Sequence, residues 1–454
     1  MGGALAVTVM SAVVPGSGIW WAGRRVLGLV TMLLALVTLV GSALYLPHDV
    51  QGALDFAFDP ARLQLSSVAL GIVLLLWTLV VVLTFLMVRP FGVRRWETGV
   101  GAVLVAALIL AVAVPTAVAS RYATVQAGFV QHVFENNQSA TAPHVEQEDP
   151  WGGRDRVNLL LLGGDGGPYR DGVRTDSMIL VSVDTQTGKA VSFSLPRNMM
   201  KAPFPVTSPL HDVFPDGFTG AGDPGSWMLN AVYREVPILY PHILGKSANE
   251  GADAIKQAFE GATGLPVDYY VLINFEGFQQ MVDAIGGITV NINEPVAVNG
   301  NTDAGIPPTR YLEPGPDQHL NGLDALWFAR GRYGSDDYQR MDRQRCVISA
   351  IAAKANPLNL LRNYQSVAKA GQELIRTDIP RELLPAFVDL GLEVKEHRLK
   401  SVVFRYDDSF NPGAPDFGYV QDTVAKALAP HRPRAHRPPA EQDTKDACAY
   451  HPAG

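Results

Sequence analysis

Arginines are unusually dense in one stretch of this chain. Five of them lie between Arg330 and Arg345, although the formal net charge of the protein is −7 at pH 7. A guanidinium group is planar, permanently charged and able to donate parallel hydrogen bonds to paired oxygens, which suits carboxylates and phosphates. The stretch therefore predicts a binding site for a multiply charged anion.

A helix that starts near Tyr338 would carry part of this stretch on one face, because Arg340, Arg343 and Gln344 are three and four residues apart. Positive charge in a first helical turn opposes the helix dipole, whereas an anion bound there is favourable. The alternative is a surface helix with Asp336 or Asp337 as its N-cap and arginines that pair with acids. That alternative explains Asp337 but not so many arginines at this helix end, so we favour the phosphate site.

Four further charged residues flank predicted strands. Asp165 follows the first predicted strand, Arg174 and Asp176 precede the second, and Arg197 follows the third. Each signal is weak alone, since a tight turn, an exposed ion pair or a surface arginine explains it equally well. Loops at strand ends often carry binding residues. Their common position, together with the later arginines, indicates one shared cleft.

The elements that would position these residues alternate along the chain. Residues 184–189 are rich in turn formers and predict a hairpin between the second and third strands. Ser247 and Glu250 form a capping-box pattern at the start of a helix that Gly261 and Gly264 end. Alternating strands and helices predict an α/β domain with a mixed central sheet flanked by helices. The predicted strands are residues 157–162, 178–183, 190–195, 268–273, 288–292 and 401–406, and the predicted helices are residues 247–259, 275–285, 321–329 and 381–390.

Residues 1–119 read as a membrane region. Three apolar runs, residues 26–46, 65–88 and 99–119, contain no charge, and each is about 20 residues long, the length that a bilayer core requires. Arginines precede the first run and lie between the second and third, so the positive-inside rule predicts a multi-pass protein with a cytoplasmic N-terminus and an extracytoplasmic remainder. The leading apolar segment contains Pro15-Gly16. It predicts a short membrane-associated or re-entrant piece in preference to a fourth span.

The remainder of the chain divides by composition. Residues 120–153 are polar and acidic, as in a tether that can begin as a helical continuation of the third run. Residues 154–430 are long enough for a single core, and residues 431–454 predict a flexible C-terminal tail. The two cysteines, Cys346 and Cys448, fall in the expected oxidising compartment, which favours a disulfide over one buried and one free thiol.

The domain contains, in this order, Asp165, Arg174-x-Asp176, Pro196-Arg197, Asn230-Ala231-x-Tyr233, Asp268-Tyr269-Tyr270, Asp283-Ala284-x-Gly286-Gly287-Ile288, Arg330-x-Arg332 and Asp337-x-x-Arg340-x-x-Arg343-Gln344. This series resembles the LytR-CpsA-Psr family over about residues 154 to 355, and its last motif is the most specific. Members of that family are membrane-anchored extracytoplasmic enzymes. The resemblance implies an α/β/α domain and a cell-membrane location.

The resemblance also implies an activity, in which a glycopolymer moves from a polyprenyl-pyrophosphate carrier onto peptidoglycan and leaves polyprenyl phosphate. It implies Mg²⁺ (or Mn²⁺) on Asp165 and Asp176, since Mg²⁺ prefers one or two carboxylates. Asp337 is a candidate for orienting or deprotonating the acceptor hydroxyl, with an N-cap role as the alternative. The implied catalytic residues are Arg197, Arg330, Arg332, Asp337 and Arg340, and the implied substrate-binding residues are Arg174, Arg343 and Gln344.

The sequence departs from the family pattern in places. Asn198 stands where an aspartate is usual, and Gly166-Gly167-Pro168 replaces a polar residue and an arginine. Two other functions stay open, namely a polyprenyl-pyrophosphate hydrolase with water as acceptor and a non-catalytic envelope regulator. No helix-turn-helix pattern stands out, so no nucleic-acid partner is expected. The sequence does not identify the glycopolymer.

Overall fold

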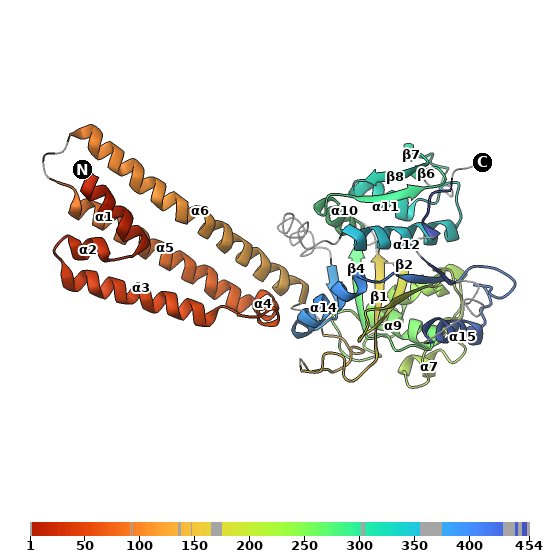
Figure 1. The fold of residues 1–454 in the computed structure, drawn as a ribbon. Coiled ribbons are helices and arrows are strands. Elements are labelled where there is room, and N and C mark those ends of the chain that lie inside the picture. Colours follow the sequence, from red (N-terminus) through yellow and green to blue (C-terminus); the bar gives the residue numbers. More distant parts are fainter. Residues whose placement is uncertain are drawn as a thin grey trace. The chain divides into compact units, whose positions relative to one another are not determined.

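The computed structural model describes residues 2–134, 138–164, 175–300, 305–354, 375–429, 441–443 and 447–451, apart from residues 91, 93 and 147. The chain forms two compact units, Met1–Val130 and Gln131–Gly454. Figure 1 shows the helical first unit in red and orange and the mixed second unit in yellow to blue.

The first unit is built from apolar helices. Three of them, α3, α5 and α6, are long and apolar enough to cross a membrane. They contain the predicted runs almost completely, and α6 continues well beyond residue 119. The helices are α1 (Gly2–Val13), α2 (Ser17–Trp21), α3 (Arg25–Tyr45), α4 (Val50–Ala57), α5 (Pro60–Val88) and α6 (Arg95–Phe134).

The leading apolar segment forms α1 and α2, which pack on α5. The Ser11 and Thr84 hydroxyls lie 3.0 Å apart, and the Trp77 indole nitrogen donates to the main-chain oxygen of Ala12 at 3.0 Å. The chain turns between the two helices at Gly16, whose φ is +98°. At 12 residues α1 is shorter than a membrane span.

The second unit contains a mixed sheet, as predicted. The seven strands that the structure describes lie in the order β11-β10-β3-β2-β1-β4-β9. Strands β1 and β4 are parallel, as are β3 and β10, whereas β2 is antiparallel to both of its neighbours. The predicted hairpin joins β2 and β3. The strands are β1 (Arg156–Gly164), β2 (Thr175–Asp184), β3 (Ala190–Ser194), β4 (Tyr269–Asn274), β9 (Ile375–Thr377), β10 (Lys400–Val403) and β11 (Glu441–Asp443).

This strand order brings separate segments to one edge of the sheet. Because β1, β3, β4 and β10 run in the same direction, their C-terminal ends meet at the edge where β2 begins. Gly164 at the end of β1 is paired with Thr175 at the start of β2. The loops expected to form one cleft therefore start from the same edge.

Two hydrophobic cores are seen in the described part of the second unit. One joins the central strands to α8, α9 and α15, and the other joins two small sheets, β5·β8 and β6·β7, to α10, α11 and α12. In Figure 1, α10, α11 and α12 lie beyond the tips of the β1 and β4 arrows. These elements are β5 (Ile288–Ile292), β6 (Val296–Val298), β7 (Arg310–Leu312), β8 (Gly315–Leu320), α7 (Pro209–Val213), α8 (Leu229–Leu239), α9 (Glu250–Thr263), α10 (Phe275–Ala284), α11 (Gly322–Arg330), α12 (Asp337–Lys354), α14 (Leu384–Lys395) and α15 (Phe417–Leu428), with 3₁₀ turns at Pro224–Trp227 and Arg381–Leu383.

The start of α9 differs from the prediction. Its N-cap is Asn249, whose side chain accepts a hydrogen bond from the main-chain nitrogen of Ala252 at 3.1 Å. Ser247 instead accepts from the main-chain nitrogen of Asn249, and the Glu250 carboxylate pairs with His242. The predicted capping box is therefore wrong, because a nearer side chain caps the helix. Gly264 ends α9 as predicted, in the left-handed conformation.

The described parts of the C-terminal tail are bound to the domain. Strand β11 pairs with β10, and Cys448 forms a disulfide with Cys346 of α12, which confirms the favoured pairing. The side-chain nitrogens of Asn291 and Asn293 donate to the main-chain oxygens of Cys448 and Ala449 at 2.9 and 3.1 Å. Composition predicted a flexible tail. It could not reveal these contacts, because the partners of the tail come from distant segments.

A buried ion pair fixes α9 to the central sheet. The Lys256 ammonium lies 2.6 Å from an Asp378 carboxylate oxygen, and both side chains are almost fully buried. Lys256 also donates to the main-chain oxygen of Asp268 at 2.9 Å, and Asp378 accepts from the main-chain nitrogen of Tyr270 at 2.7 Å. These added hydrogen bonds offset part of the cost of removing both charges from water.

Replacing one member of this pair should destabilise the domain strongly. We expect Lys256→Met to lower the free energy of unfolding by about 3–5 kcal/mol, because it leaves a buried carboxylate uncompensated. The double variant Lys256→Met/Asp378→Leu should lose much less than the sum of the two single variants. Denaturant unfolding of the four proteins measures this coupling, and additive losses would contradict it.

Candidate active site

Two consecutive aspartates at the N-terminus of α12, Asp336 and Asp337, make different contacts. The Asp336 carboxylate accepts from the main-chain nitrogen of Gln339 at 2.7 Å, while the Gln339 side chain accepts from the main-chain nitrogen of Asp336 at 3.0 Å. This is a reciprocal capping box. Asp336 is therefore the cap, and the carboxylate of Asp337 is available for other contacts.

The Asp337 carboxylate lies among three arginines. Its oxygens are 3.4 Å from Nε of Arg197, 4.0 Å from Nη1 of Arg332 and 3.0 Å from Nη2 of Arg340. Arg340 is almost fully buried, whereas Arg332 is half-exposed. We call these four residues the arginine cluster. Guanidinium groups donate paired hydrogen bonds to phosphate oxygens, so the cluster suits a group such as pyrophosphate.

Two contacts place the arginine cluster at the predicted sheet edge. Arg197 lies just after β3, and its main-chain oxygen accepts from the nitrogen of Asn230 at 3.1 Å. Gln344 of α12 donates to the hydroxyl of Ser177, near the start of β2, at 2.6 Å. The structure thus brings the late arginine motif to the edge from which the β1–β2 and β3 loops leave the sheet.

Arg330 is held by two aromatic rings. Its guanidinium carbon lies 4.2 Å from the ring centre of Phe275 and 4.8 Å from that of Trp327. Phe275 is the first residue after β4, so this stack also belongs to the same sheet edge. Such stacking orients a guanidinium group while its nitrogens can still donate hydrogen bonds. The sequence reasoning missed Phe275, although an aromatic residue directly after a buried strand was a usable signal.

Arg343, predicted to bind substrate, makes its described bonds to main chain. Its Nε donates to the oxygen of Phe328 at 2.7 Å, and its Nη2 donates to the oxygen of Gly331. Burial lowers its pKa to about 10, with the nearby Arg340 acting in the same direction, so it stays charged at neutral pH. Arg343 thereby fastens α12 to the end of α11 and positions the segment that carries Arg330 and Arg332.

The remaining predicted residues are only partly described. Asp165 and Arg174 lie outside the described residues, and Asp176 is the second residue of β2. The start of β2 lies beside the end of β1, because Thr175 is paired with Gly164. Among the described residues no group of three or more histidine, cysteine, aspartate or glutamate side chains could hold a metal ion.

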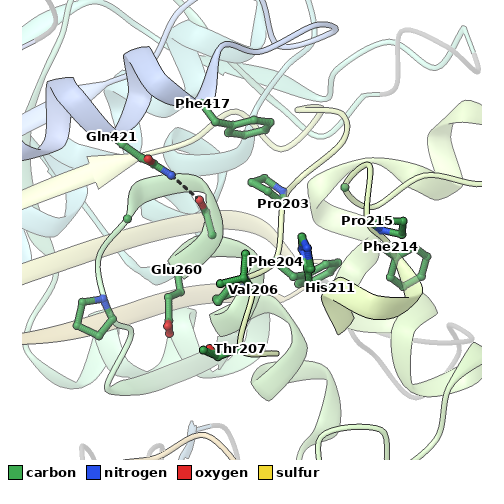
Figure 2. Close-up of a pocket in the computed structure, with 15 residues that line it drawn as sticks. Pro203, Phe204, Val206, Thr207, His211, Phe214, Pro215, Glu260, Phe417 and Gln421 are labelled. Atoms are coloured by element: carbon green, nitrogen blue, oxygen red, sulfur yellow. Dashed lines mark hydrogen bonds between the residues drawn. The ribbon is translucent and has the colours of Figure 1, made fainter. Parts of the chain in front are cut away.

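A separate cavity of about 550 Å³ lies away from this edge (Figure 2). Its wall includes Gly264 and Pro266, which precede β4, whereas Phe275 follows β4. A six-residue strand spans about 20 Å. Phe204, Val206 and Phe417 make the cavity largely apolar, and Glu260 is its carboxylate. No arginine is among the described residues that line it, so the cavity is separate from the arginine cluster.

Comparison with known proteins places the chain in a family. A profile of the LytR_cpsA_psr family matches residues 122–430. The chain belongs to the LytR-CpsA-Psr family. A polyisoprenyl-teichoic acid–peptidoglycan teichoic acid transferase TagU from Oceanobacillus iheyensis is 31% identical over 242 residues, which are 51% of this chain and 61% of that protein. The biofilm regulatory protein A of Streptococcus mutans is 30% identical over 230 residues, which are 49% of this chain and 50% of that protein.

The chain thus spans between half and about six-tenths of the length of these two relatives. A solved structure of a Streptococcus agalactiae protein aligns with 62% of this chain and 90% of its own, at 27% identity and a TM-score of 0.45. Membership of the LytR-CpsA-Psr family confirms the resemblance inferred from the motifs.

Replacing the central carboxylate should strengthen anion binding. In Asp337→Asn one negative charge is removed from among three arginines, so inorganic pyrophosphate should bind the full-length protein at least about fivefold more tightly, or about 1 kcal/mol. Calorimetric titration measures the affinity. Asp336→Ala is the matched control, and it should cost about 1 kcal/mol of stability through the lost cap while changing the affinity little. Unchanged or weaker binding by Asp337→Asn would contradict competition between this carboxylate and the anion.

Proposed function

We propose that this protein is a phosphotransferase that moves a glycopolymer from a polyprenyl-pyrophosphate carrier onto peptidoglycan. The observation that carries the proposal is the arginine cluster, in which three guanidinium groups from two separate segments converge at the edge where β2 begins. The names of the TagU relatives add support, since they describe transfer of teichoic acid from polyisoprenyl to peptidoglycan.

The reaction would be a single displacement at phosphorus. An acceptor hydroxyl on peptidoglycan attacks the sugar-linked phosphorus, and the bond from that phosphorus to the bridging oxygen breaks. The products are a phosphodiester between glycopolymer and peptidoglycan and free polyprenyl phosphate, while the hydroxyl proton passes to a base. Asp337 lies among the arginines and would orient or deprotonate that hydroxyl. Its carboxylate is available for this role because Asp336 provides the helix cap.

Charge neutralisation is the main contribution required of the chain in phosphoryl transfer. Arg197, Arg332 and Arg340 would bind the phosphate oxygens. Further contacts would come from Arg174, from Gln344 and from Arg330, which is stacked on Phe275. Arg343 would act through the α11–α12 connection, because its bonds go to main-chain oxygens.

Asp165 and Asp176 would hold Mg²⁺ (or Mn²⁺). Two carboxylates suit this ion, and the support for Asp176 is that β2, which carries it near its start, begins beside the end of β1. When bound, the ion would neutralise charge on the pyrophosphate. The arginines would then contact the phosphate oxygens directly, and the two carboxylates would act on the same group only through the ion they hold.

The expected topology agrees with this substrate. Arginines on the cytoplasmic side of the three apolar helices would place the second unit outside the cytoplasm, where peptidoglycan and the lipid-linked glycopolymer are found. The Cys346–Cys448 disulfide supports this location, because such bonds persist in oxidising compartments.

Reconstitution tests the activity. Full-length protein in lipid vesicles is given a polyprenyl-pyrophosphate glycan, Mg²⁺ and peptidoglycan fragments, and glycan bound covalently to peptidoglycan is measured. We expect Arg332→Gln to reduce transfer about 100-fold or more, since it removes a charge from the reacting phosphates. Arg381→Gln, which removes a surface arginine paired with Glu382, should transfer normally. A chelator should abolish transfer, and added Mg²⁺ should restore it.

Other outcomes separate the alternatives. Release of lipid phosphate without glycan on the acceptor would identify a hydrolase. If cells with Arg332→Gln attach their glycopolymer normally, a regulatory role would replace the catalytic one. The name of the Streptococcus mutans relative is the observation that keeps this regulatory alternative in view.

Reporter fusions test the topology. A phosphatase that is active only outside the cytoplasm should be active when fused after residue 430 and inactive when fused after Arg94. A reporter after residue 430 that works only in the cytoplasm would reverse the proposed orientation. The fusion after Arg94 serves as the control, because it reports the loop between α5 and α6.

A further inference from the structure

The apolar cavity of Figure 2 lies beside the C-terminal end of α9, since Gly261, Gly264 and Pro266 are part of its wall. Its volume of about 550 Å³ is within the range of about 300–1,000 Å³ that is usual for small-molecule sites. The proposed phosphoryl transfer uses none of the residues that line it. The cavity therefore needs an explanation of its own.

The segments that form the wall are fastened to each other. A Cβ added at Gly261 would collide with the main-chain oxygen of Pro203, so the loop before α7 passes directly against α9. The side-chain nitrogen of Gln421, on α15, donates to the main-chain oxygen of Gly261 at 2.9 Å. The wall is thus preformed, as small-molecule sites usually are.

Glu260 is a carboxylate on this wall without a basic partner. It accepts a hydrogen bond from the side-chain nitrogen of Gln257 at 3.4 Å. Lys256, whose charge acts on it, is paired with Asp378 instead. Among the described residues that line the cavity there is no arginine or lysine, and His211 is the other ionisable side chain. Burial raises the pKa of Glu260 more than its neighbours lower it.

The end of α9 adds to the negative field of this carboxylate. A helix C-terminus carries the equivalent of about half a negative charge, so basic side chains are favourable there and acidic ones are not. The last turn of α9 contains Glu260 and no basic residue. Two separate features, the carboxylate and the helix end, therefore favour a cation at this wall.

The rest of the wall decides which cation fits. A bound metal ion usually has several oxygen ligands, whereas no group of three or more histidine, cysteine, aspartate or glutamate side chains is found among the described residues. An ammonium group pairs with one carboxylate and donates to neutral acceptors such as the Thr207 hydroxyl. Phe204, Val206 and Phe417 offer apolar surface to an aliphatic chain.

We propose that this cavity binds the ammonium end of an aliphatic primary amine, such as a lysine side chain, and that Glu260 pairs with it. The methylene groups of the ligand would lie against the apolar part of the wall. Two sources share this chemistry, namely a lysine-like side chain of a peptide and a free aliphatic diamine. The inference goes beyond the proposed function, because transfer at phosphorus uses no group in this cavity.

The binding test uses full-length protein in micelles of an uncharged detergent near neutral pH. One probe is N-acetyl-lysine methylamide, and its partner is the 2-aminoheptanoic analogue, in which a methyl group replaces the ammonium. Calorimetric titration should show saturable binding of the lysine compound and at least about tenfold weaker binding of the analogue. Equal binding of the two compounds would overturn the proposal, because the charge would then contribute nothing.

A third probe, 1,5-diaminopentane, tells the two sources apart. If it binds more tightly than the lysine compound, the site and a free diamine as its ligand are both supported. If it binds more weakly, the site and a peptide side chain are supported. A diamine and a lysine compound that both fail to bind would refute the site.

Replacing the carboxylate makes the test specific. Glu260→Gln changes the size of the side chain little and should weaken the lysine compound at least about tenfold. Glu382→Gln, at a surface carboxylate paired with Arg381, should leave the affinity unchanged. Because burial raises the pKa of Glu260, its charged form is unfavourable at neutral pH, so Glu260→Gln should unfold at the same temperature or a slightly higher one. Unchanged affinity or a large loss of stability would count against the assignment.

A variant at the rim tests the site without altering Glu260. Val206 lines the cavity and is 80% exposed, so Val206→Lys should fold normally. Its ammonium group would compete for the same carboxylate and should weaken the lysine compound at least about fivefold. Leu392→Lys, at an exposed position of α14, is the matched control and should bind normally. Equal affinities in these two variants would contradict a cation site in this cavity.

Discussion

The site depends on the ion pairs between the Asp337 carboxylate and three arginines. Arg197 comes from the loop after β3, Arg332 from the connection before α12 and Arg340 from the first turns of that helix, and like charges repel at such distances. One carboxylate among them lets the arginines converge before any substrate arrives. A pyrophosphate carries more negative charge than one carboxylate, so three guanidinium groups would attract it more strongly than they attract Asp337. Because Asp336 caps α12, the Asp337 carboxylate is not needed as the cap and can contact the arginines.

Helix α12 is the common support for most of the features described above. One side carries Arg340 and Gln344 to the sheet edge, and Arg343 fastens the helix to the end of α11. The other side carries Asp342 and Cys346, which connect it to β10 and to the C-terminal tail. A helix held from several directions positions charged side chains more accurately than a loop would, and accurate positioning is what phosphoryl transfer requires.

The sequence predicted those parts of the site that depend on interactions between residues near each other in the chain. Buried strands, the arginine spacing and the family motifs placed the cluster at a sheet edge, and the strand order agrees with that. The sequence did not predict which of Asp336 and Asp337 caps α12 and which contacts the arginines. Either of two adjacent aspartates can be the N-cap until the first residue of the helix is known. Phe275 lies far from Arg330 in sequence, so their stacking depends on how β4 and α11 pack. The binding of the tail to Asn291 and Asn293 likewise depends on distant segments.

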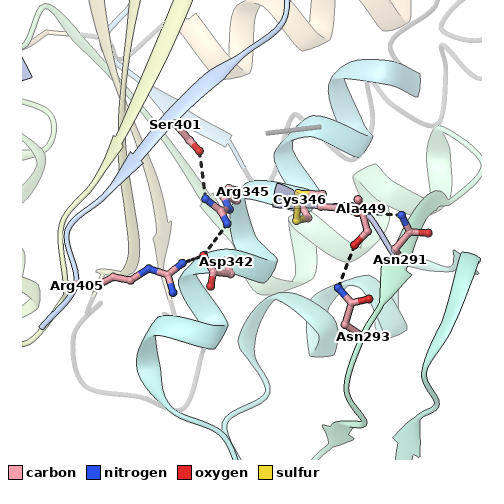
Figure 3. Close-up of a disulfide and its surroundings, with 9 residues drawn as sticks. Asn291, Asn293, Asp342, Arg345, Cys346, Ser401, Arg405 and Ala449 are labelled. Atoms are coloured by element: carbon pink, nitrogen blue, oxygen red, sulfur yellow. Dashed lines mark hydrogen bonds and ion pairs between the residues drawn. A yellow bond between two sulfur atoms is a disulfide. The ribbon is translucent and has the colours of Figure 1, made fainter. Parts of the chain in front are cut away.

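The disulfide between Cys346 and Cys448 joins residues 102 positions apart (Figure 3). The helix that carries the arginine motif is therefore complete in sequence long before its covalent partner has been synthesised. In the topology proposed above, α12 would leave the membrane before Cys448 does, so the disulfide would form only after the tail has been exported. The final fixing of α12 would then depend on the export and oxidation of a segment about 100 residues further along the chain.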